Sequence, residues 1–173
     1  MDATPLLPHP IFIYMRAKET QAPNPIEDKD GYLKVFLAGS IEMGVAEDWQ
    51  QELIGLLSDK PIEFLNPRRD DWDSSWTQEY GDNEFTEQVE WELSSLDAAD
   101  LIICYFDKET KSPITMMELG LHAKSQKLIV CCPEGFYRKG NVDVVCNKYG
   151  IKQVDKLDEL ANVLRLRSLI STI

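Results

Sequence analysis

Five short apolar segments, separated by longer amphipathic ones, run through most of this 173-residue chain. They are rich in Val, Ile, Leu, Phe and Cys, and they span 35–41, 62–65, 101–105, 127–132 and 151–154. Continuous apolar runs of this length are typical of strands that are buried on both faces of a parallel sheet. The pattern therefore restricts the chain to folds in which helices cover both sides of such a sheet.

The segments between these strands carry apolar residues at helical spacing. We expect helices over 46–57, 84–98, from Pro113 onward, from about 141, and over 155–170. Right-handed crossovers would distribute these helices over both faces of the sheet. The prediction is an α/β fold, a flavodoxin-like doubly wound three-layer sandwich with a five-stranded, mostly parallel sheet.

Composition and charge narrow the class of protein. Residues 1–30 contain several prolines and charges and are predicted to be a leader with a candidate edge strand at 11–15, ahead of a single domain at 31–173. No apolar run approaches the roughly 20 residues of a membrane span, and no signal peptide is recognised, so a cytoplasmic protein is expected. The net charge of −12 argues against a nucleic acid polymer as partner. With 2 His and 4 Cys and no C-x-x-C pair, neither a metal nor a cofactor is expected.

One predicted helix carries a carboxylate within its apolar face. Ser112 is expected to be the N-cap residue and Pro113 the first helical residue. The apolar stripe of this helix would consist of Ile114, Met117 and Leu121. Glu118 lies inside that stripe, so it is either an edge residue paired with a cation or a carboxylate held against apolar walls for a purpose.

The predicted topology brings this helix to a cleft. The turn at Gly39-Ser40 and the loop before Ser112 follow the strands that flank the topological switch point, where ligands bind in such sheets. Glu92 borders the apolar face of its own helix, although such a residue is more often a surface carboxylate. Enzymes that act on glycosidic bonds commonly use two carboxylates, one at the anomeric carbon of the sugar and one for proton transfer. From the residues alone, an enzyme acting at an N-glycosidic bond is one candidate among several.

Three motifs together resemble the nucleoside 2-deoxyribosyltransferase superfamily. They are Phe36-Leu-Ala-Gly-Ser-Ile41, Ala99-Asp-Leu-Ile-Ile-Cys104 and Met117-Glu-Leu-Gly120. The resemblance covers about residues 34–154. It implies a flavodoxin-like fold, a homo-oligomer (a dimer or larger) whose active sites are completed across subunits, and a retaining mechanism in which a glutamate attacks C1′ of the deoxyribose.

The resemblance also implies roles for particular residues. Glu118 resembles the nucleophile, and Glu92 looks to occupy the place of an aspartate that assists proton transfer at the base. Asn141 looks like the asparagine that is supplied to a neighbouring subunit's site. The residues expected to bind the substrate are Gly39, Ser40, Ile41, Ser112 and Trp72, together with Asn141.

The resemblance leaves the substrate open. Ser112 stands where the transferases carry a second aspartate, and in this it is similar to the deoxynucleoside 5′-monophosphate N-hydrolase branch. Glu42, however, follows the turn where that branch has a basic residue, and its charge disfavours a phosphate. The expected partners are a nucleoside or nucleotide and a free base, without a membrane. The alternatives are hydrolysis of a 5′-monophosphate, non-catalytic binding of a nucleotide or nucleotide sugar, and an interaction module.

Overall fold

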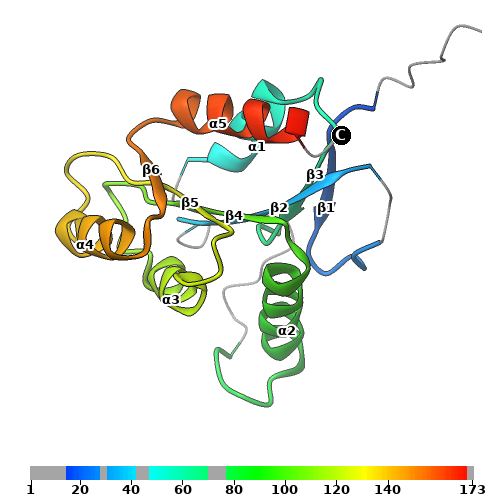
Figure 1. Ribbon diagram of the computed structural model, residues 1–173. Helices are drawn as coiled ribbons and strands as arrows, with labels where there is room; N and C mark the ends of the chain where they lie inside the picture. Colours follow the sequence, from blue (N-terminus) through cyan, green and yellow to red (C-terminus); the bar gives the residue numbers. More distant parts are fainter. Residues whose placement is uncertain (1–14, 28–30, 42–46, 70–76, 171–173) are drawn as a thin grey trace, which may run out of the picture.

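The computed structural model describes residues 15–27, 31–41, 47–69 and 77–170 of the chain (Figure 1). Strands and helices alternate along most of it. In chain order they are β1 (Lys18–Gln21), β2 (Leu33–Gly39), α1 (Trp49–Leu56), β3 (Ile62–Asn66), α2 (Asn83–Ala98), β4 (Leu101–Tyr105), α3 (Pro113–His122), β5 (Leu128–Cys131), α4 (Lys139–Tyr149), β6 (Lys152–Val154) and α5 (Leu157–Ile170). The α/β class predicted from the alternation is confirmed.

The strands form one sheet in the order β1-β3-β2-β4-β5-β6, and every pairing in it is parallel. The strands β2 to β6 follow the flavodoxin-like order, with the switch point between β2 and β4. The prediction of five strands was wrong, because the sheet has six. The additional strand, β1, comes from the predicted leader and pairs with β3.

The polar composition of β1 explains why the apolar pattern did not reveal it. Lys18 and Thr20 face Glu63, a residue of β3 that is fully buried. Lys18 Nζ lies 2.9 Å from Glu63 Oε1, and Thr20 Oγ1 donates a hydrogen bond to the same oxygen over 2.9 Å. The strand therefore supplies the partners of a buried carboxylate rather than apolar surface. Of the edge strand predicted at 11–15, all but Met15 lies outside the described residues.

Helices cover both faces of the sheet (Figure 1). Helices α1 and α5 pack on one face, over a core that includes Leu37, Leu53 and Leu160. On the other face lie α2, α3 and α4, over a core that includes Phe36 and Leu119. None of the helices in the described ranges is long and apolar enough to cross a membrane. The face with α2 and α3 is the one on which the predicted carboxylates lie.

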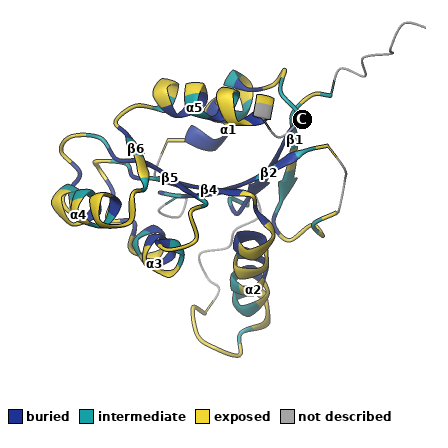
Figure 2. Cartoon of the chain, viewed as in Figure 1, coloured by how far each residue is buried: buried dark blue, intermediate teal, exposed yellow. Residues whose placement is uncertain are grey.

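Helix α3 is rotated relative to the sequence prediction. Its predicted apolar stripe is exposed, with 54% of Ile114, 52% of Met117 and 62% of Leu121 accessible to solvent. The face that packs on the sheet carries Glu118 and Leu119 instead, and Figure 2 shows the helix with one buried and one exposed side. The predicted burial of the stripe was therefore wrong, because spacing identifies an apolar face but not the surface that it packs against.

Candidate active site

Three hydroxyl groups meet where β2 and β4 end. They belong to Ser40, Thr110 and Ser112, and all three residues are buried. The oxygens of Ser40 and Ser112 are hydrogen-bonded to each other, and Thr110 Oγ1 lies 2.8 Å from both of them. The structure brings together Ser40 and Ser112, which were predicted to lie in one cleft, and it adds Thr110. Hydroxyls grouped in this way both donate and accept hydrogen bonds, as sugar hydroxyls and anions require.

Backbone and side-chain contacts fix Ser40 at the edge of the sheet. Its N–H donates to the carbonyl of Tyr105 over 3.0 Å, and its hydroxyl accepts from the N–H of Asp107 over 2.9 Å. Its own carbonyl accepts from the indole N–H of Trp49 over 3.1 Å. The hydroxyl therefore has a defined direction. Ile41, the next residue, is half-buried.

Ser112 begins α3, as predicted, but its hydroxyl does not cap the helix. Its backbone is left-handed, with φ 47° and ψ 52°, a conformation that costs a non-glycine residue about 1–2 kcal/mol. In this conformation the hydroxyl contacts Ser40 and Thr110 instead of the helix N–H groups. Ser112 is therefore the N-cap residue by position, as predicted, but without the side-chain hydrogen bond that a serine at this position usually makes. Strain of this kind is concentrated at functional sites in proteins.

Gly39 lies against the aromatic ring of Trp49, so the space beside its Cα is filled. A Cβ atom at this position would contact the ring of Trp49 and lie 2.9 Å from both Trp49 Cε2 and the Tyr105 carbonyl oxygen. The indole of Trp49 is buried and stacks on the ring of Tyr105, with a centroid distance of 4.7 Å. The glycine thus lets α1 approach the end of β2. It was predicted as a substrate-binding residue, and this close approach gives the position a packing role.

Gly39→Ala should lower the free energy of unfolding by about 1–3 kcal/mol, because the added methyl overlaps backbone and a buried ring. Gly55→Ala in α1 is the matched control, since its Cβ would meet nothing within 4 Å. That change should instead stabilise the protein by about 0.5–1 kcal/mol. Urea unfolding of both variants checks the pair, and equal effects would contradict the packing role.

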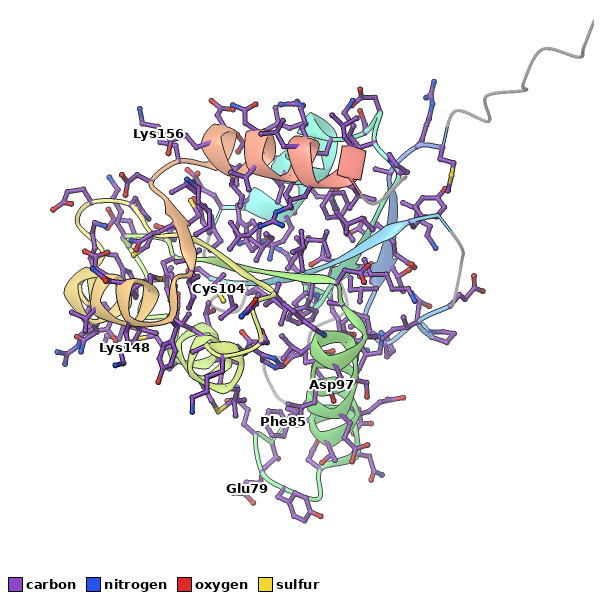
Figure 3. The ribbon with its side chains drawn as sticks, in the orientation of Figure 1. Glu79, Phe85, Asp97, Cys104, Lys148 and Lys156 are labelled. Carbon is purple, nitrogen blue, oxygen red and sulfur yellow. The ribbon has the colours of Figure 1, made fainter. Side chains whose placement is uncertain are left out.

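Glu118 is a carboxyl group buried between α3 and the sheet. It lies on the face of α3 that packs against β2 and β4, and only 5% of the residue is exposed. Burial, and then the charge of Glu92, raise the pKa of Glu118 to about 8. Glu118 in turn contributes, after burial, to the raised pKa of the Cys104 thiol on β4 (Figure 3). At neutral pH the carboxyl group is therefore mostly protonated.

Glu92 lies on α2 and is half-buried. Burial raises its pKa, and a hydrogen bond from Gln88 opposes that shift. Gln88 Nε2 donates to Glu92 Oε1 over 2.8 Å. The charge of Glu92 contributes to the raised pKa of Glu118, so the two predicted carboxyl groups are close enough to interact electrostatically although they lie on different helices. Carboxyl groups whose pKa values are raised by burial, one of them also by the charge of the other, are a recognised mark of functional sites.

The structure does not bring every predicted residue to this region. Asn141 is exposed in the first turn of α4, a helix that packs against β6. Trp72 lies outside the described residues. Thr110 and Gln88 were missed, although Thr110 stands only two residues before Ser112 in a loop that follows a switch-point strand. That position was the available signal for Thr110.

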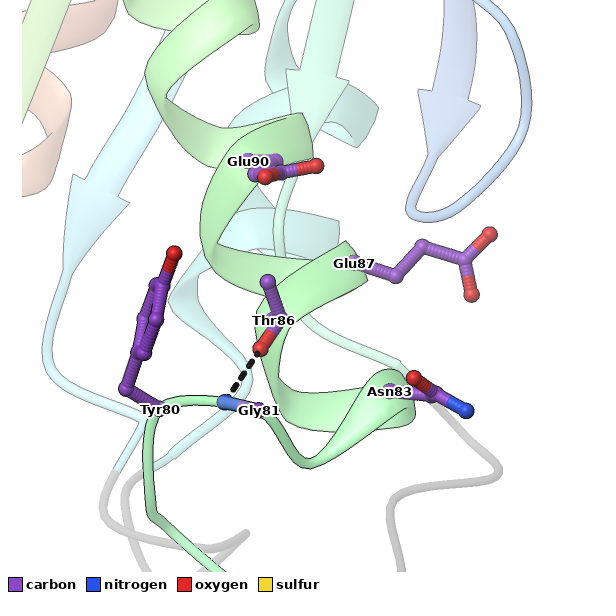
Figure 4. Close-up of a pocket in the computed structure, with 6 residues that line it drawn as sticks. All are labelled: Tyr80, Gly81, Asn83, Thr86, Glu87 and Glu90. Atoms are coloured by element: carbon purple, nitrogen blue, oxygen red, sulfur yellow. Dashed lines mark hydrogen bonds between the residues drawn. The ribbon is translucent and has the colours of Figure 1, made fainter.

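A hollow of about 440 Å³ lies elsewhere, at the start of α2 (Figure 4). Tyr80, Gly81, Asn83, Thr86, Glu87 and Glu90 line it. The N–H of Gly81 donates to Thr86 Oγ1 over 3.4 Å, and Tyr80 is 99% exposed. The hollow is an open surface feature without a buried titratable group, so the carboxylate pair is the better candidate for chemistry. Within the described ranges, no group of three His, Cys, Asp or Glu side chains is placed to hold a metal ion.

Comparison with known proteins identifies the family. A family model described as nucleoside 2-deoxyribosyltransferase-like matches residues 32–136, more than half of the 173-residue chain. The chain belongs to this family. The match contains both β2 and α3, and hence the hydroxyl cluster and both carboxylates. Membership supports, at a coarse level, a role in glycosyl transfer on nucleoside-type substrates, and such family members are typically enzymes.

A solved structure supports the fold of this family member independently. It is the crystal structure of a conserved protein from Enterococcus faecalis V583, with a TM-score of 0.55 and 15% sequence identity. The similarity covers 79% of this chain and 99% of that chain. At this identity the likeness concerns the fold alone. No curated protein matches the sequence.

Proposed function

We propose that this family member acts at the N-glycosidic bond of a nucleoside, deoxynucleoside or nucleotide, either cleaving it or transferring its sugar to a second base, with Glu118 as the nucleophile. The observation that carries the proposal is the burial of Glu118 on the face of α3 that packs against the two switch-point strands, within range of the charge of Glu92. The family match supports the same class of reaction. A pair of carboxyl groups beside the sugar suits a reaction whose transition state resembles a sugar cation.

The proposed reaction has two steps. An oxygen of ionised Glu118 forms a bond to C1′ while the bond from C1′ to the base nitrogen breaks, and its electron pair leaves with the base. Glu92 assists the protonation of the departing base, either as the acid or by orienting the proton donor. In the second step an oxygen of water or a nitrogen of a second base bonds to C1′ and gives its proton back to the group that protonated the first base. The bond between C1′ and Glu118 breaks, and its electron pair returns to the carboxylate. Attack by a second base gives transfer, and attack by water gives hydrolysis.

The hydroxyl cluster is proposed to hold the sugar or its 5′ end. Ser40, Thr110 and Ser112 lie at the carboxyl edge of the sheet, where ligands of such folds bind. Hydroxyls accept and donate equally, so this cluster suits a 5′-hydroxyl as well as a phosphate oxygen. The alternative of a deoxynucleoside 5′-monophosphate N-hydrolase therefore stays beside the nucleoside reaction.

Non-catalytic binding of a nucleotide or nucleotide sugar is the competing function. One observation favours it: a carboxyl group with a pKa of about 8 is mostly protonated at pH 7 and cannot attack C1′ in that form. The two functions differ in their pH dependence, because a nucleophile must lose its proton whereas a neutral hydrogen-bond donor must keep it.

If Glu118 is the nucleophile, kcat/KM for base release should rise with pH and level off above about 8. Glu92→Gln should lower the maximum rate and also move the midpoint to lower pH, because the charge of Glu92 is the second cause of the raised pKa of Glu118. Chromatography of free base over a pH series measures both. A rate that falls on passing through pH 8 would contradict the assignment.

Incubation of the protein with a panel of deoxynucleosides and their 5′-monophosphates, each with and without an acceptor base, distinguishes a transferase, a hydrolase and a binding protein. Exchange of one base for another identifies a transferase, and release of base without an acceptor identifies a hydrolase. Tight binding without any base release across the panel would overturn the catalytic proposal. It would support the binding protein instead.

We further propose that the protein is a homo-oligomer. The exposed side chains of Ile114, Met117 and Leu121 form an apolar face of α3, next to the buried face that carries Glu118. Large apolar side chains gathered on a surface are typical of protein interfaces. A second copy covering this face would bury the helix that carries the proposed nucleophile. Light scattering measures the mass in solution, and the mass of one chain would contradict the proposal.

A further inference from the structure

Gln88 is a buried amide whose contacts differ from those expected on a helix surface. It lies on α2, only 3% of the residue is exposed, and it reaches toward the sheet rather than solvent. Its Nε2 donates two hydrogen bonds, one to the Pro67 carbonyl over 2.9 Å and one to Glu92 Oε1 over 2.8 Å. Both hydrogens of the amide nitrogen are therefore used.

These contacts fix the orientation of the Gln88 amide. The Pro67 carbonyl can only accept, so the nitrogen of the amide and not its oxygen must face it. The same nitrogen reaches Glu92 one helical turn further along, at the i, i+4 spacing that places two side chains together. The amide oxygen, Oε1, is buried without a hydrogen-bond partner among the described residues. A buried polar atom left in this way is costly, so the amide is kept there for its nitrogen.

The carbonyl that anchors Gln88 belongs to a segment that other residues hold in place. Ala22 N–H donates to the Asn66 carbonyl over 3.0 Å, and Gln21 Nε2 donates to the Arg68 carbonyl over 2.8 Å. Both contacts come from β1 and the residue after it, so Pro67 is held on both sides. A series of hydrogen bonds thus connects β1 and the segment around Pro67 to Gln88, and from Gln88 to the carboxylate of Glu92.

We propose that Gln88 is a positioning residue for Glu92: its amide ties the carboxylate to the end of β3 and favours the ionised form. Glu92 is thereby held where its charge acts on Glu118 of α3, whose charge in turn acts on the Cys104 thiol of β4. Charge-assisted hydrogen bonds of this kind are about twice as strong as neutral ones. The importance of this role for catalysis rests on the proposed function, but the contact itself does not.

Carbon-13 NMR titration of the glutamate side-chain carboxyl groups tests the proposal without a substrate. Gln88→Met keeps the length and apolar volume of the side chain but removes both donors. We expect the proton affinity of Glu92 to rise roughly tenfold, since a charge-assisted bond to the ionised form is lost. Glu92→Gln assigns the resonance. Gln50→Met is the matched control, because Gln50 is equally buried but its Oε1 accepts from Arg68 rather than contacting Glu92.

An unchanged Glu92 midpoint in folded Gln88→Met, or the same displacement in Gln50→Met, would overturn the positioning role. A second measurement uses the parent chain, in case Gln88→Met does not fold. The Gln88 side-chain NH₂ resonances should shift with pH at the midpoint of Glu92, and resonances that are independent of pH would contradict the contact. Absence of base release by the parent would instead count against the proposed function and would leave these titrations unaffected.

Discussion

Replacement of Glu118 by glutamine should reduce base release by about 10³-fold or more. Glutamine has the same shape as glutamate but a neutral amide, so it cannot form the bond to C1′ on which the proposed first step depends. The residue is 5% exposed, and an isosteric change disturbs such a packed position less than alanine would. Initial rates of base release for the parent and the variant, measured above pH 8, give the comparison.

Glu90→Gln is a matched control for this variant. Glu90 lies on α2 two residues before Glu92, but it is exposed and points into the open hollow at the start of the helix. Loss of this carboxylate should leave the rate of base release unchanged. Equal turnover by Glu118→Gln and the parent would remove Glu118 from the role of nucleophile.

The substitution Glu118→Gln should also stabilise the folded protein at alkaline pH. The pKa of Glu118 is raised from 4.5 to about 8, so the folded state binds the proton more tightly than the unfolded chain does. The stability that this proton provides is complete below pH 4.5 and is lost as the pH rises through 8. The rise of this pKa from 4.5 to about 8 corresponds to at most about 5 kcal/mol. Glu118→Gln has no such dependence, so its advantage over the parent should grow with pH.

Urea unfolding at pH 5 and at pH 8.5 measures this difference for the parent, Glu118→Gln and Glu90→Gln. The gap between the parent and Glu118→Gln should widen by several kcal/mol between the two pH values, toward the limit set by the pKa shift. Glu90→Gln should follow the parent throughout, because Glu90 is exposed. A gap of the same size at both pH values would mean that burial does not raise the pKa of Glu118. Stability gained where the nucleophile is removed is the usual cost of an active site.

The buried strands could be predicted from sequence because each of them is a continuous apolar run. The strand β4 was predicted with the bounds that the structure has, Leu101–Tyr105. The strand β1 was not recognised, because Lys18–Gln21 contains no apolar residue and is held by contacts with Glu63 that lies more than 40 positions away. Contacts of that kind are tertiary, and no local pattern encodes them.

Helix α3 shows where periodicity misled. Ile114, Met117 and Leu121 have the spacing of a buried stripe, but the sheet is covered by Thr115, Glu118 and Leu119. Spacing alone does not distinguish an apolar face that packs inside one chain from one available to another chain. The position of Glu118 as an anomaly within an apolar pattern was nevertheless informative, because the carboxylate is buried.

The part of the candidate site that depends on strand topology could be predicted from the sequence. The part that depends on hydrogen bonds between side chains from distant segments could not. Ser40 and Ser112 follow the two switch-point strands, and their hydroxyls meet. Gln88 gave no signal, because a glutamine in the middle of a polar helix is usually on the surface. Its role depends on Pro67, which reaches it only through the folded sheet.

The intact mass of the protein shortly after mixing with a deoxynucleoside tests the central claim most directly. The account predicts a parent chain that carries one sugar residue, located by peptide mapping on the segment that contains Glu118. It predicts no such adduct in Glu118→Gln. Release of base by the parent with the same adduct on Glu118→Gln, or with the sugar located on another residue, would contradict the assignment of Glu118 as the nucleophile.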